Sequence, residues 1–173
     1  MSLETAALAA RVHAALRSLD ATIAVAESLT GGLLGGALTD VAGSSATFRG
    51  GVIAYATELK ASLLGVDPAL LARHGAVHPE VAAAMARGVA HELQATFGLA
   101  TTGVAGPDPQ DGRAPGEVHL ALAGPGIGSG GTVVASLALS GGRDDVRRET
   151  VRRALALAVE QLAADGKPGK QTG

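Results

Sequence analysis

Three stretches of this sequence place hydroxyl, amine and glycine residues directly after runs of apolar residues. They are 27–32 (ESLTGG), 50–60, which contains Tyr55 and Lys60, and 101–107 (TTGVAGP). If each apolar run is a strand of an open α/β sheet, the stretches follow strand ends, which is where such sheets bind ligands. Glycines let a backbone approach a ligand closely, and helix N-termini present free N–H groups to anions. The pattern indicates one site for a small anionic molecule, although each stretch taken alone also fits an ordinary helix cap or tight turn.

Ser28 and Lys60 are the residues that could form a nucleophile and its base. A serine hydroxyl needs a base before it attacks an amide carbonyl, and the chain has no cysteine and no histidine in a recognisable catalytic pattern. Serine–lysine pairs are a known solution. The lysine must be neutral, and lowering its pKa from about 10.4 to near 7 corresponds to roughly 4–5 kcal/mol, which burial can supply. Tyr55 could orient the lysine or relay a proton. The spacing alone also fits a tyrosine on an edge strand and a lysine on the surface.

Several familiar catalytic and cofactor motifs are absent from the sequence. It contains no P-loop, no G-x-G-x-x-G that opens a helix, and no G-x-S-x-G around Ser28. The histidines, at positions 13, 74, 78, 91 and 119, form no H-E-x-x-H motif or similar ligand pair. We therefore expect a protein that uses no metal ion and no other cofactor.

The composition is that of a globular protein with one ordinary domain. The chain has 173 residues, 47% of them apolar and 17% charged, and a net charge of −2. Its basic cluster, Arg143 to Arg153, is interrupted by acidic residues, which is typical of a solvated helix face. Because nucleic-acid binding needs clustered positive charge, we expect no nucleic-acid partner. The sequence shows neither a signal peptide nor an apolar run of about 18 residues, so we expect a cytoplasmic protein that does not contact membranes.

Apolar spacing and turn residues predict alternating helices and strands. Helices are expected over residues 3–19, 57–64 and 143–164, after the glycines at 31 and 32, and from Pro79 onward. Strands are expected over residues 22–26, 50–56, 99–104, 117–123 and 132–139, with a Pro- and Gly-rich loop over 107–116.

This order of elements predicts one layered α/β domain over residues 1–164, with a mixed, largely parallel sheet flanked by helices. The polar segment 165–173 is expected to be a disordered tail.

Four blocks together resemble the CinA carboxy-terminal domain family. They are AESLTGG (26–32), GGVIAYATELKASLLGV (50–66), GAVHPEVAAAMARG (75–88) and TTGVAGPD (101–108), and they occur in the family's order. The resemblance covers about residues 5–163. It implies an α/β fold and, for free-standing members, the hydrolysis of nicotinamide mononucleotide to nicotinate mononucleotide and ammonia, in pyridine-nucleotide recycling. It implies no metal ion, and related proteins suggest a homodimer.

The resemblance also implies roles for individual residues. The family's nucleophilic serine falls on Ser28, its lysine on Lys60 and its assisting tyrosine on Tyr55. Its threonine falls on Thr102 and its late arginine on Arg143, with Arg147 as a rival placement. The expected substrate-binding residues are Thr30, Gly31, Gly32, Thr102, Gly103, Gly106 and Arg143. Backbone N–H groups near Gly31 or over 103–106 are expected to hold the oxyanion, and Thr30, Thr102 and Arg143 the ribose phosphate.

The sequence departs from the family pattern at several positions. Leu29 stands where the family often has cysteine, and His78 stands where a serine N-cap is usual. The loop over 107–116 lacks the usual lysine, which Arg113 could replace. The larger members carry an amino-terminal domain, and we expect a stand-alone protein without it. Two other readings stay open, namely a non-catalytic nucleotide-binding or regulatory module and an amidase for another small amide.

Overall fold

Five strands form one sheet in the order β2-β1-β3-β4-β5 in a computed structural model that describes residues 2–165. The strands are β1 (Ile23–Glu27), β2 (Phe48–Ile53), β3 (Phe97–Gly103), β4 (Glu117–Ala123) and β5 (Thr132–Ala138). β1 is parallel to β2 and to β3, whereas β4 is antiparallel to β3 and to β5. The prediction of a mixed sheet is confirmed, with its parallel half at the β2 edge and its antiparallel half at the β5 edge.

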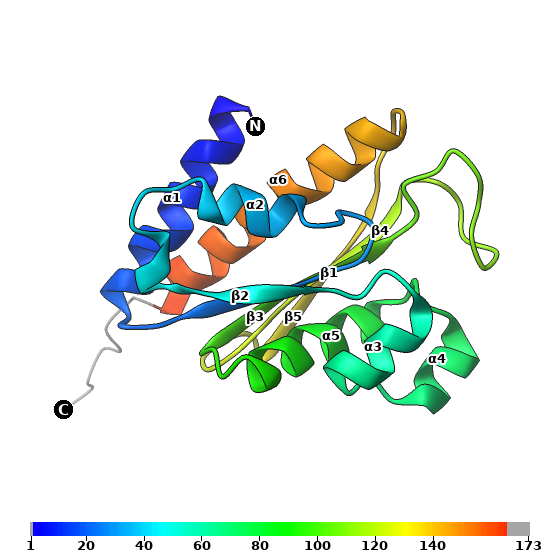
Figure 1. Cartoon of the computed structure of the whole chain (residues 1–173), viewed down its shortest axis with the longest axis horizontal. Coiled ribbons are helices and arrows are strands. Elements are labelled where there is room, and N and C mark those ends of the chain that lie inside the picture. Colours follow the sequence, from blue (N-terminus) through cyan, green and yellow to red (C-terminus); the bar gives the residue numbers. More distant parts are fainter. Residues whose placement is uncertain (1, 166–173) are drawn as a thin grey trace.

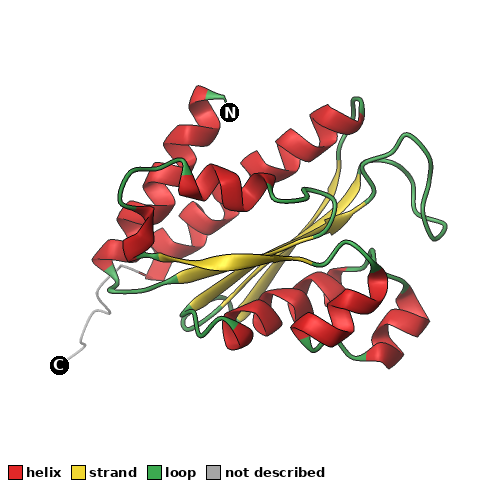
Figure 2. Ribbon diagram, in the orientation of Figure 1, coloured by secondary structure: helices red, strands yellow, loops and turns green. Residues whose placement is uncertain are grey.

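The helices cover both faces of this sheet (Figures 1 and 2). One face carries α1 (Leu3–Ser18), α2 (Leu33–Thr39) and α6 (Arg143–Asp165), and the other carries α3 (Thr57–Leu64), α4 (Pro68–His74) and α5 (Pro79–Glu92). A short 3-10 turn, Ser44–Ala46, precedes β2. Two hydrophobic clusters result, one on each side of the sheet. The layered α/β class predicted from the sequence is therefore confirmed.

Side-chain caps explain where several helices begin. Ser2 accepts a hydrogen bond from the Thr5 N–H at the start of α1, and Asp67 accepts one from the Ala69 N–H at the start of α4. The His78 ring accepts one from the backbone N–H of Glu80 at the start of α5. Proline is the first residue of both α4 and α5, a position where its missing N–H costs nothing.

Small residues let α5 lie very close to its neighbours. A Cβ atom on Gly88 of α5 would fall on the carbonyl oxygen of Leu64, and a Cβ atom on Gly98 of β3 would fall on that of Ala86. Both glycines are needed because two backbones meet there. The core is consequently packed in part by close approach of backbones.

Most predicted elements lie within two or three residues of the observed ones. The main shift is at β2, which begins at Phe48 and ends at Ile53, so Tyr55 follows the strand instead of lying in it. α6 extends to Asp165, and the rest of the predicted tail, 166–173, lies outside the described residues. None of the helices between residues 2 and 165 combines the length and apolar character that a bilayer crossing requires.

Candidate active site

Ser28 and Lys60 meet at the carboxyl edge of the parallel half of the sheet. Ser28 follows the last residue of β1, and Lys60 lies in α3, which begins shortly after β2. The pairing of Glu27 with Ile53 and the hydrogen bond from the Ala54 N–H to the Glu27 carbonyl, 2.8 Å long, align the two strand ends. The Lys60 Nζ lies 3.2 Å from the Ser28 Oγ. The sequence-predicted pair is thus within hydrogen-bond reach.

Lys60 is held in an environment that favours its neutral form. Its side chain is 0% exposed, and its Nζ donates a 2.8 Å hydrogen bond to the Ala54 carbonyl. Burial lowers the pKa of Lys60 from 10.5 to about 8, although the negative charges of Glu58 and Asp111 act in the opposite direction. A pKa near 8 leaves roughly a tenth of the amine unprotonated at pH 7. The lysine can therefore act as a base near neutral pH.

Glu27 anchors the loop that carries Ser28 through the start of α2. Its buried carboxylate accepts hydrogen bonds from the N–H groups of Gly32, Leu34 and Gly35, at 2.8–3.1 Å, and so satisfies the first turn of α2. A carboxylate at this position also complements the positive end of a helix. Glu27 was not among the predicted functional residues, although an acidic residue a few positions before a helix is a recognisable signal.

Arg147, in α6, anchors the same loop through its backbone carbonyls. Its guanidinium donates to the carbonyl of Leu29 at 3.0 Å and to that of Thr30 at 2.9 Å. This forked contact fixes the backbone directly after Ser28. Arg147 was a rival candidate for phosphate binding, and the structure instead places its guanidinium against backbone carbonyls.

A small cavity opens above the Ser28–Lys60 pair. Its volume is about 90 Å³, and it is lined by Ser28, Leu29, Tyr55, Lys60, Ala76, Val77, Thr102, Gly103, Val104, Ala105, Gly106, Asp108, Gln110 and Arg143. We call it the reaction cavity. The three stretches predicted to form one site, 27–32, 50–60 and 101–107, all contribute residues to its lining. Asp108 and Gln110 were not predicted, because nothing in a Pro- and Gly-rich loop indicates which of its side chains point inward.

Arg143 and Tyr55 lie together at this cavity. One guanidinium nitrogen of Arg143 donates to the Tyr55 hydroxyl at 2.9 Å, and another donates to the Gly106 carbonyl at 2.8 Å. Tyr55 is 57% exposed, and its hydroxyl is engaged by Arg143, whereas the Ala54 carbonyl is what orients Lys60. Arg143 thus adds a positive charge to the cavity wall, where it can meet an anionic ligand.

The other predicted binding residues divide into two groups. Thr102, Gly103 and Gly106 line the reaction cavity, and the Thr102 hydroxyl donates to the Ala76 carbonyl at 2.7 Å. Thr30 is fully buried, with its hydroxyl paired to that of Thr101, so it supports the loop and does not face a ligand. Gly31 and Gly32 do not line this cavity.

Backbone N–H groups at the cavity can serve as oxyanion donors. The Gly31 N–H is already bound to the Ser28 carbonyl at 3.1 Å. The N–H groups of Leu29, Ala105 and Gly106 have no acceptor among residues 2–165, and all three residues line the cavity. The oxyanion position expected over 103–106 therefore has free donors, and Leu29 is an additional one.

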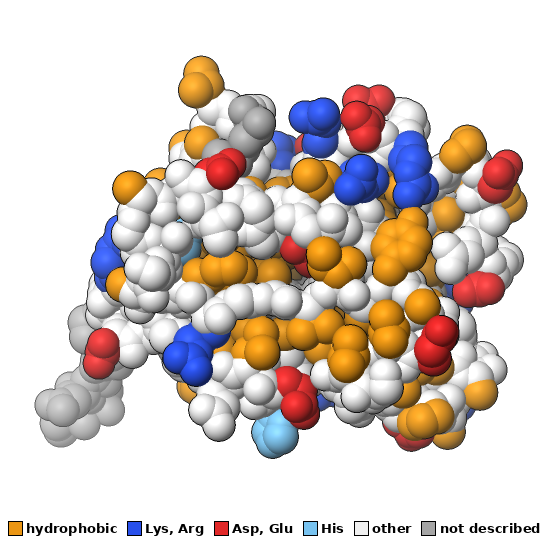
Figure 3. All heavy atoms as spheres, viewed as in Figure 1, with side chains coloured by type: hydrophobic (Ala, Val, Ile, Leu, Met, Phe, Trp, Pro, Cys, Tyr) orange, Lys and Arg blue, Asp and Glu red, His pale blue; other side chains and the backbone are white. Residues whose placement is uncertain are grey.

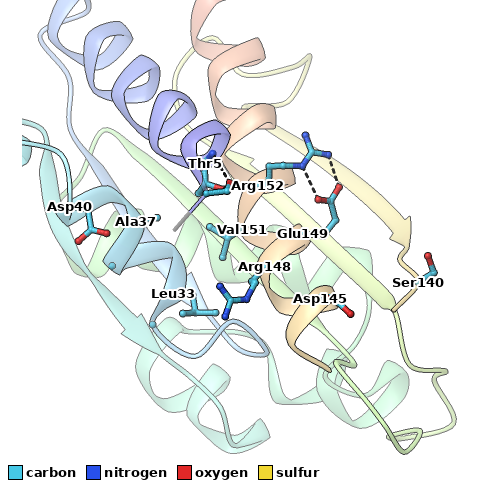
Figure 4. Close-up of a pocket in the computed structure, with 13 residues that line it drawn as sticks. Thr5, Leu33, Ala37, Asp40, Ser140, Asp145, Arg148, Glu149, Val151 and Arg152 are labelled. Carbon is cyan, nitrogen blue, oxygen red and sulfur yellow. Dashed lines mark hydrogen bonds and ion pairs between the residues drawn. The ribbon is translucent and has the colours of Figure 1, made fainter. Parts of the chain in front are cut away.

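A larger cavity of about 590 Å³ lies between α1, α2 and α6 (Figure 4). Leu33 and Arg148 lie near one another at one of its walls, and Arg152 is held by Glu149 at another. Neither Ser28 nor Lys60 lines it. The larger space is separate from the groups that could perform chemistry.

Comparisons with known proteins identify the family of the chain. The family model described as the CinA C-terminal domain matches residues 5–162. A CinA-like protein from Frankia casuarinae is 58% identical over 83% of this chain and 32% of its own length, and one from Gloeobacter violaceus is 48% identical over 90% and 36%. The chain thus spans about a third of the length of these curated relatives.

Solved structures show the same likeness over nearly the whole of both chains. A competence/damage inducible protein, CihA, from Agrobacterium tumefaciens has 35% identity and a TM-score of 0.85, covering 96% of this chain and 100% of that one. A competence-damaged protein (CinA) superfamily protein from Klebsiella pneumoniae has 32% identity and a TM-score of 0.86, covering 92% and 98%. The chain belongs to the CinA C-terminal domain family.

Proposed function

We propose that this protein is an amidohydrolase that converts nicotinamide mononucleotide to nicotinate mononucleotide and ammonia. The observation that carries the proposal is the buried Lys60 amine, 3.2 Å from the Ser28 hydroxyl, with its pKa lowered to about 8. Burial of an amine costs free energy, because it disfavours the charged form. Groups with pKa values perturbed in this way are common in active sites. The choice of substrate rests on the family resemblance.

The reaction begins with proton transfer from Ser28 to Lys60. In its neutral form, Lys60 donates one hydrogen to the Ala54 carbonyl and accepts the serine proton with its lone pair. The Ser28 Oγ then bonds to the carboxamide carbon, and the carbonyl oxygen becomes an oxyanion. The free N–H groups of Leu29, Ala105 and Gly106 are the donors that stabilise it.

The protonated Lys60 then gives its proton to the amide nitrogen. The C–N bond breaks, ammonia leaves, and an ester joins the nicotinoyl group to Ser28. Water attacks this ester with the neutral Lys60 as base, which releases the carboxylate product and restores the serine. The lysine acts first as base, then as acid, and returns to its starting state.

Arg143 is the residue we assign to the phosphate of the substrate. It lies at the cavity, and its fork suits a phosphate group. Its present partners, the Tyr55 hydroxyl and the Gly106 carbonyl, are neutral groups that a dianionic phosphate can displace or share. Tyr55 then positions Arg143 at the entrance to the cavity.

The size of the reaction cavity favours a second candidate, hydrolysis of a smaller amide. Sites for drug-sized ligands measure about 300–1,000 Å³, whereas this cavity measures about 90 Å³. It holds the reacting carboxamide end of a mononucleotide, while the ribose phosphate must lie outside it. A small linear amide would fit entirely inside and would use the same Ser28–Lys60 pair.

Ammonia release from nicotinamide mononucleotide by the purified protein tests the proposal. We expect turnover that persists in EDTA and is abolished in Ser28→Ala and in Lys60→Ala, with Ser18→Ala, an exposed serine of α1, as the matched control. Turnover retained in Ser28→Ala would exclude Ser28 as nucleophile. Release from small amides but not from the mononucleotide would favour the second candidate, and nucleotide binding without any release would indicate a non-catalytic binding module.

The assembly of the protein remains a prediction. Exposed apolar side chains, among them Ile53, Tyr55 and Leu63, lie along and beyond the edge strand β2. The space-filling view shows apolar side chains gathered over this part of the molecule (Figure 3). A homodimer that covers this edge is consistent with both observations, and sedimentation velocity of the wild type tests it.

A further inference from the structure

Two histidines and a glutamate lie together where α4 ends and α5 begins. His74 is the last residue of α4, His78 is the N-cap of α5, and Glu80 is in the first turn of α5. The two imidazole rings face each other, with centroids 4.1 Å apart and planes inclined by 16°. One potential ligand atom from each of the three residues lies within 4.8 Å of the others. His74 and His78 are only four positions apart in the sequence, but they belong to different elements, because α4 ends at His74 and α5 begins at Pro79.

We propose that His74, His78 and Glu80 bind a divalent transition-metal ion of the Zn²⁺ class. Two imidazoles and one carboxylate are a donor set that Zn²⁺ uses with an open fourth position for water. Co²⁺, Ni²⁺ and Cu²⁺ accept the same donors, whereas Mg²⁺ and Ca²⁺ prefer oxygen ligands alone. The site is separate from the Ser28–Lys60 pair and does not depend on the proposed reaction.

The geometry requires only side-chain movement. Ligands about 2.1 Å from a tetrahedral ion are about 3.4 Å apart, so atoms within 4.8 Å of one another must close by at most about 1.4 Å. His74 and His78 are half-buried and Glu80 is exposed, which leaves room for rotation about their side-chain bonds. The His78 Nδ1 makes only a long contact, 3.3 Å, with the Glu80 N–H. When the His78 Nε2 binds a metal ion, the ring proton moves to Nδ1, which then cannot accept this hydrogen bond. Only this weak cap is lost.

Nearby charges also permit a cation. Arg113 is the positive side chain that acts on His78, and it is paired with Glu117 at 3.1 Å. Glu80 and Glu117 contribute negative charge to the same region. Because Glu117 neutralises Arg113, the Glu80 carboxylate leaves these three side chains with a net negative charge, which favours a divalent cation.

An ion at this cluster would act on the wall of the reaction cavity. Residues 75–77 connect α4 to the His78 cap, and Ala76 and Val77 line the cavity. The Ala76 carbonyl accepts the Thr102 hydroxyl at 2.7 Å. A metal ion that joins His74 to His78 bridges this turn and restrains its backbone, without contacting Ser28 or Lys60.

Metal titration of the protein, freed of metal by prior treatment with a chelator, tests the proposal. We expect CoCl₂ to give a visible absorption band typical of a four-coordinate ion, and ZnCl₂ to abolish this band and to bind with one ion per chain in calorimetry. His74→Gln and His78→Ser should each weaken Zn²⁺ binding by at least about tenfold. The serine keeps a capping hydroxyl on α5, so that variant retains its fold. His91→Ala, which removes an exposed histidine elsewhere on α5, is the matched control and should bind as the wild type does.

Hydrogen exchange gives a second readout, independent of catalysis. Zn²⁺ should slow exchange of the amides over 75–78 in the wild type but not in His78→Ser. The proposal is overturned if neither Zn²⁺ nor Co²⁺ binds, if MgCl₂ produces the same effects, or if the His91 variant loses as much affinity as the two ligand variants. None of these results bears on whether the Ser28 variants release ammonia, so the two proposals fail separately.

Discussion

Replacement of Lys60 by methionine should change how the stability of the protein depends on pH. The pKa of Lys60 falls from 10.5 in the unfolded chain to about 8 in the fold, which corresponds to about 3 kcal/mol. Between these two values the unfolded chain binds more protons than the folded protein, so stability rises with pH. Below about pH 8 the fold bears the full cost of burying a lysine that must give up its proton or keep a buried charge.

Methionine removes this cost and keeps most of the side-chain volume. It also leaves the Ala54 carbonyl without its donor, at a cost of about 1–3 kcal/mol, so the net change in stability at pH 7 is small. The pH dependence separates the two effects. We expect the free energy of unfolding of the wild type, relative to Lys60→Met, to rise by about 2.5 kcal/mol between pH 7 and pH 10.

Urea unfolding followed by far-ultraviolet circular dichroism at pH 7, 8, 9 and 10 measures this difference. The chain has no tryptophan and only one tyrosine, so the dichroism signal is the practical probe. Groups other than Lys60 titrate equally in both proteins and cancel in the comparison. Parallel curves for the two proteins would refute the assigned pKa and, with it, the base proposed for catalysis.

The pKa of Lys60 can also be measured directly. The chain contains three lysines, at positions 60, 167 and 170. In a protein with Lys167→Arg and Lys170→Arg, the single remaining lysine signal in an NMR titration belongs to Lys60. Its midpoint should lie near 8, and ammonia release should rise with pH through the same value as the amine loses its proton.

Three further substitutions test the packing and the supports of the Ser28 loop. Gly88→Ala should destabilise the protein by about 3 kcal/mol, because the new methyl group meets the Leu64 carbonyl and the helix must move. Arg147→Lys should lower ammonia release by about tenfold or more with little change in stability, because lysine cannot bind both loop carbonyls at once. Glu27→Gln should cost about 1–3 kcal/mol, because an amide group would face backbone N–H donors. Urea unfolding and the ammonia assay provide the measurements.

Each of these substitutions has a matched control. Gly36→Ala places a methyl group where no atom lies within 4 Å and should stabilise α2 by about 0.5–1 kcal/mol. Arg148→Lys changes the neighbouring, exposed arginine, and Glu160→Gln changes an exposed carboxylate on α6. Equal losses at Gly36 and Gly88, or equal activities for the lysine variants at 147 and 148, would contradict the contacts assigned here.

The meeting of Ser28 with Lys60 could be predicted because it follows from local rules. Each follows an apolar run, and adjacent parallel strands bring their carboxyl ends to one edge. The sheet class, the helix at Pro79 and the loop over 107–116 follow from spacing and turn residues in the same way. These features depend on short segments whose residue types carry the information.

The roles of Thr30 and Arg147 depend on contacts that no local pattern contains. Thr30 looks like a ligand-binding hydroxyl in the sequence, but the turn into α2 directs it inward to Thr101. Arg147 differs little in sequence context from Arg143, one helical turn away. Their positions on α6 send one to the cavity and the other to the loop carbonyls. Side-chain direction is set by packing, which a single sequence does not specify.

The contact between Arg147 and Leu29 also has a consequence for the order in which the protein can mature during synthesis. It joins residues 118 positions apart, from the first quarter of the chain to its last helix. When the ribosome has translated β1 and α2, the guanidinium that fixes the carbonyls after Ser28 has not yet been made. The packing of α1 is also completed only after α6 has been made, because these two helices pack against each other. A nascent chain that ends before α6 therefore contains both Ser28 and Lys60, but it lacks the Arg147 side chain that holds the backbone after Ser28 in place.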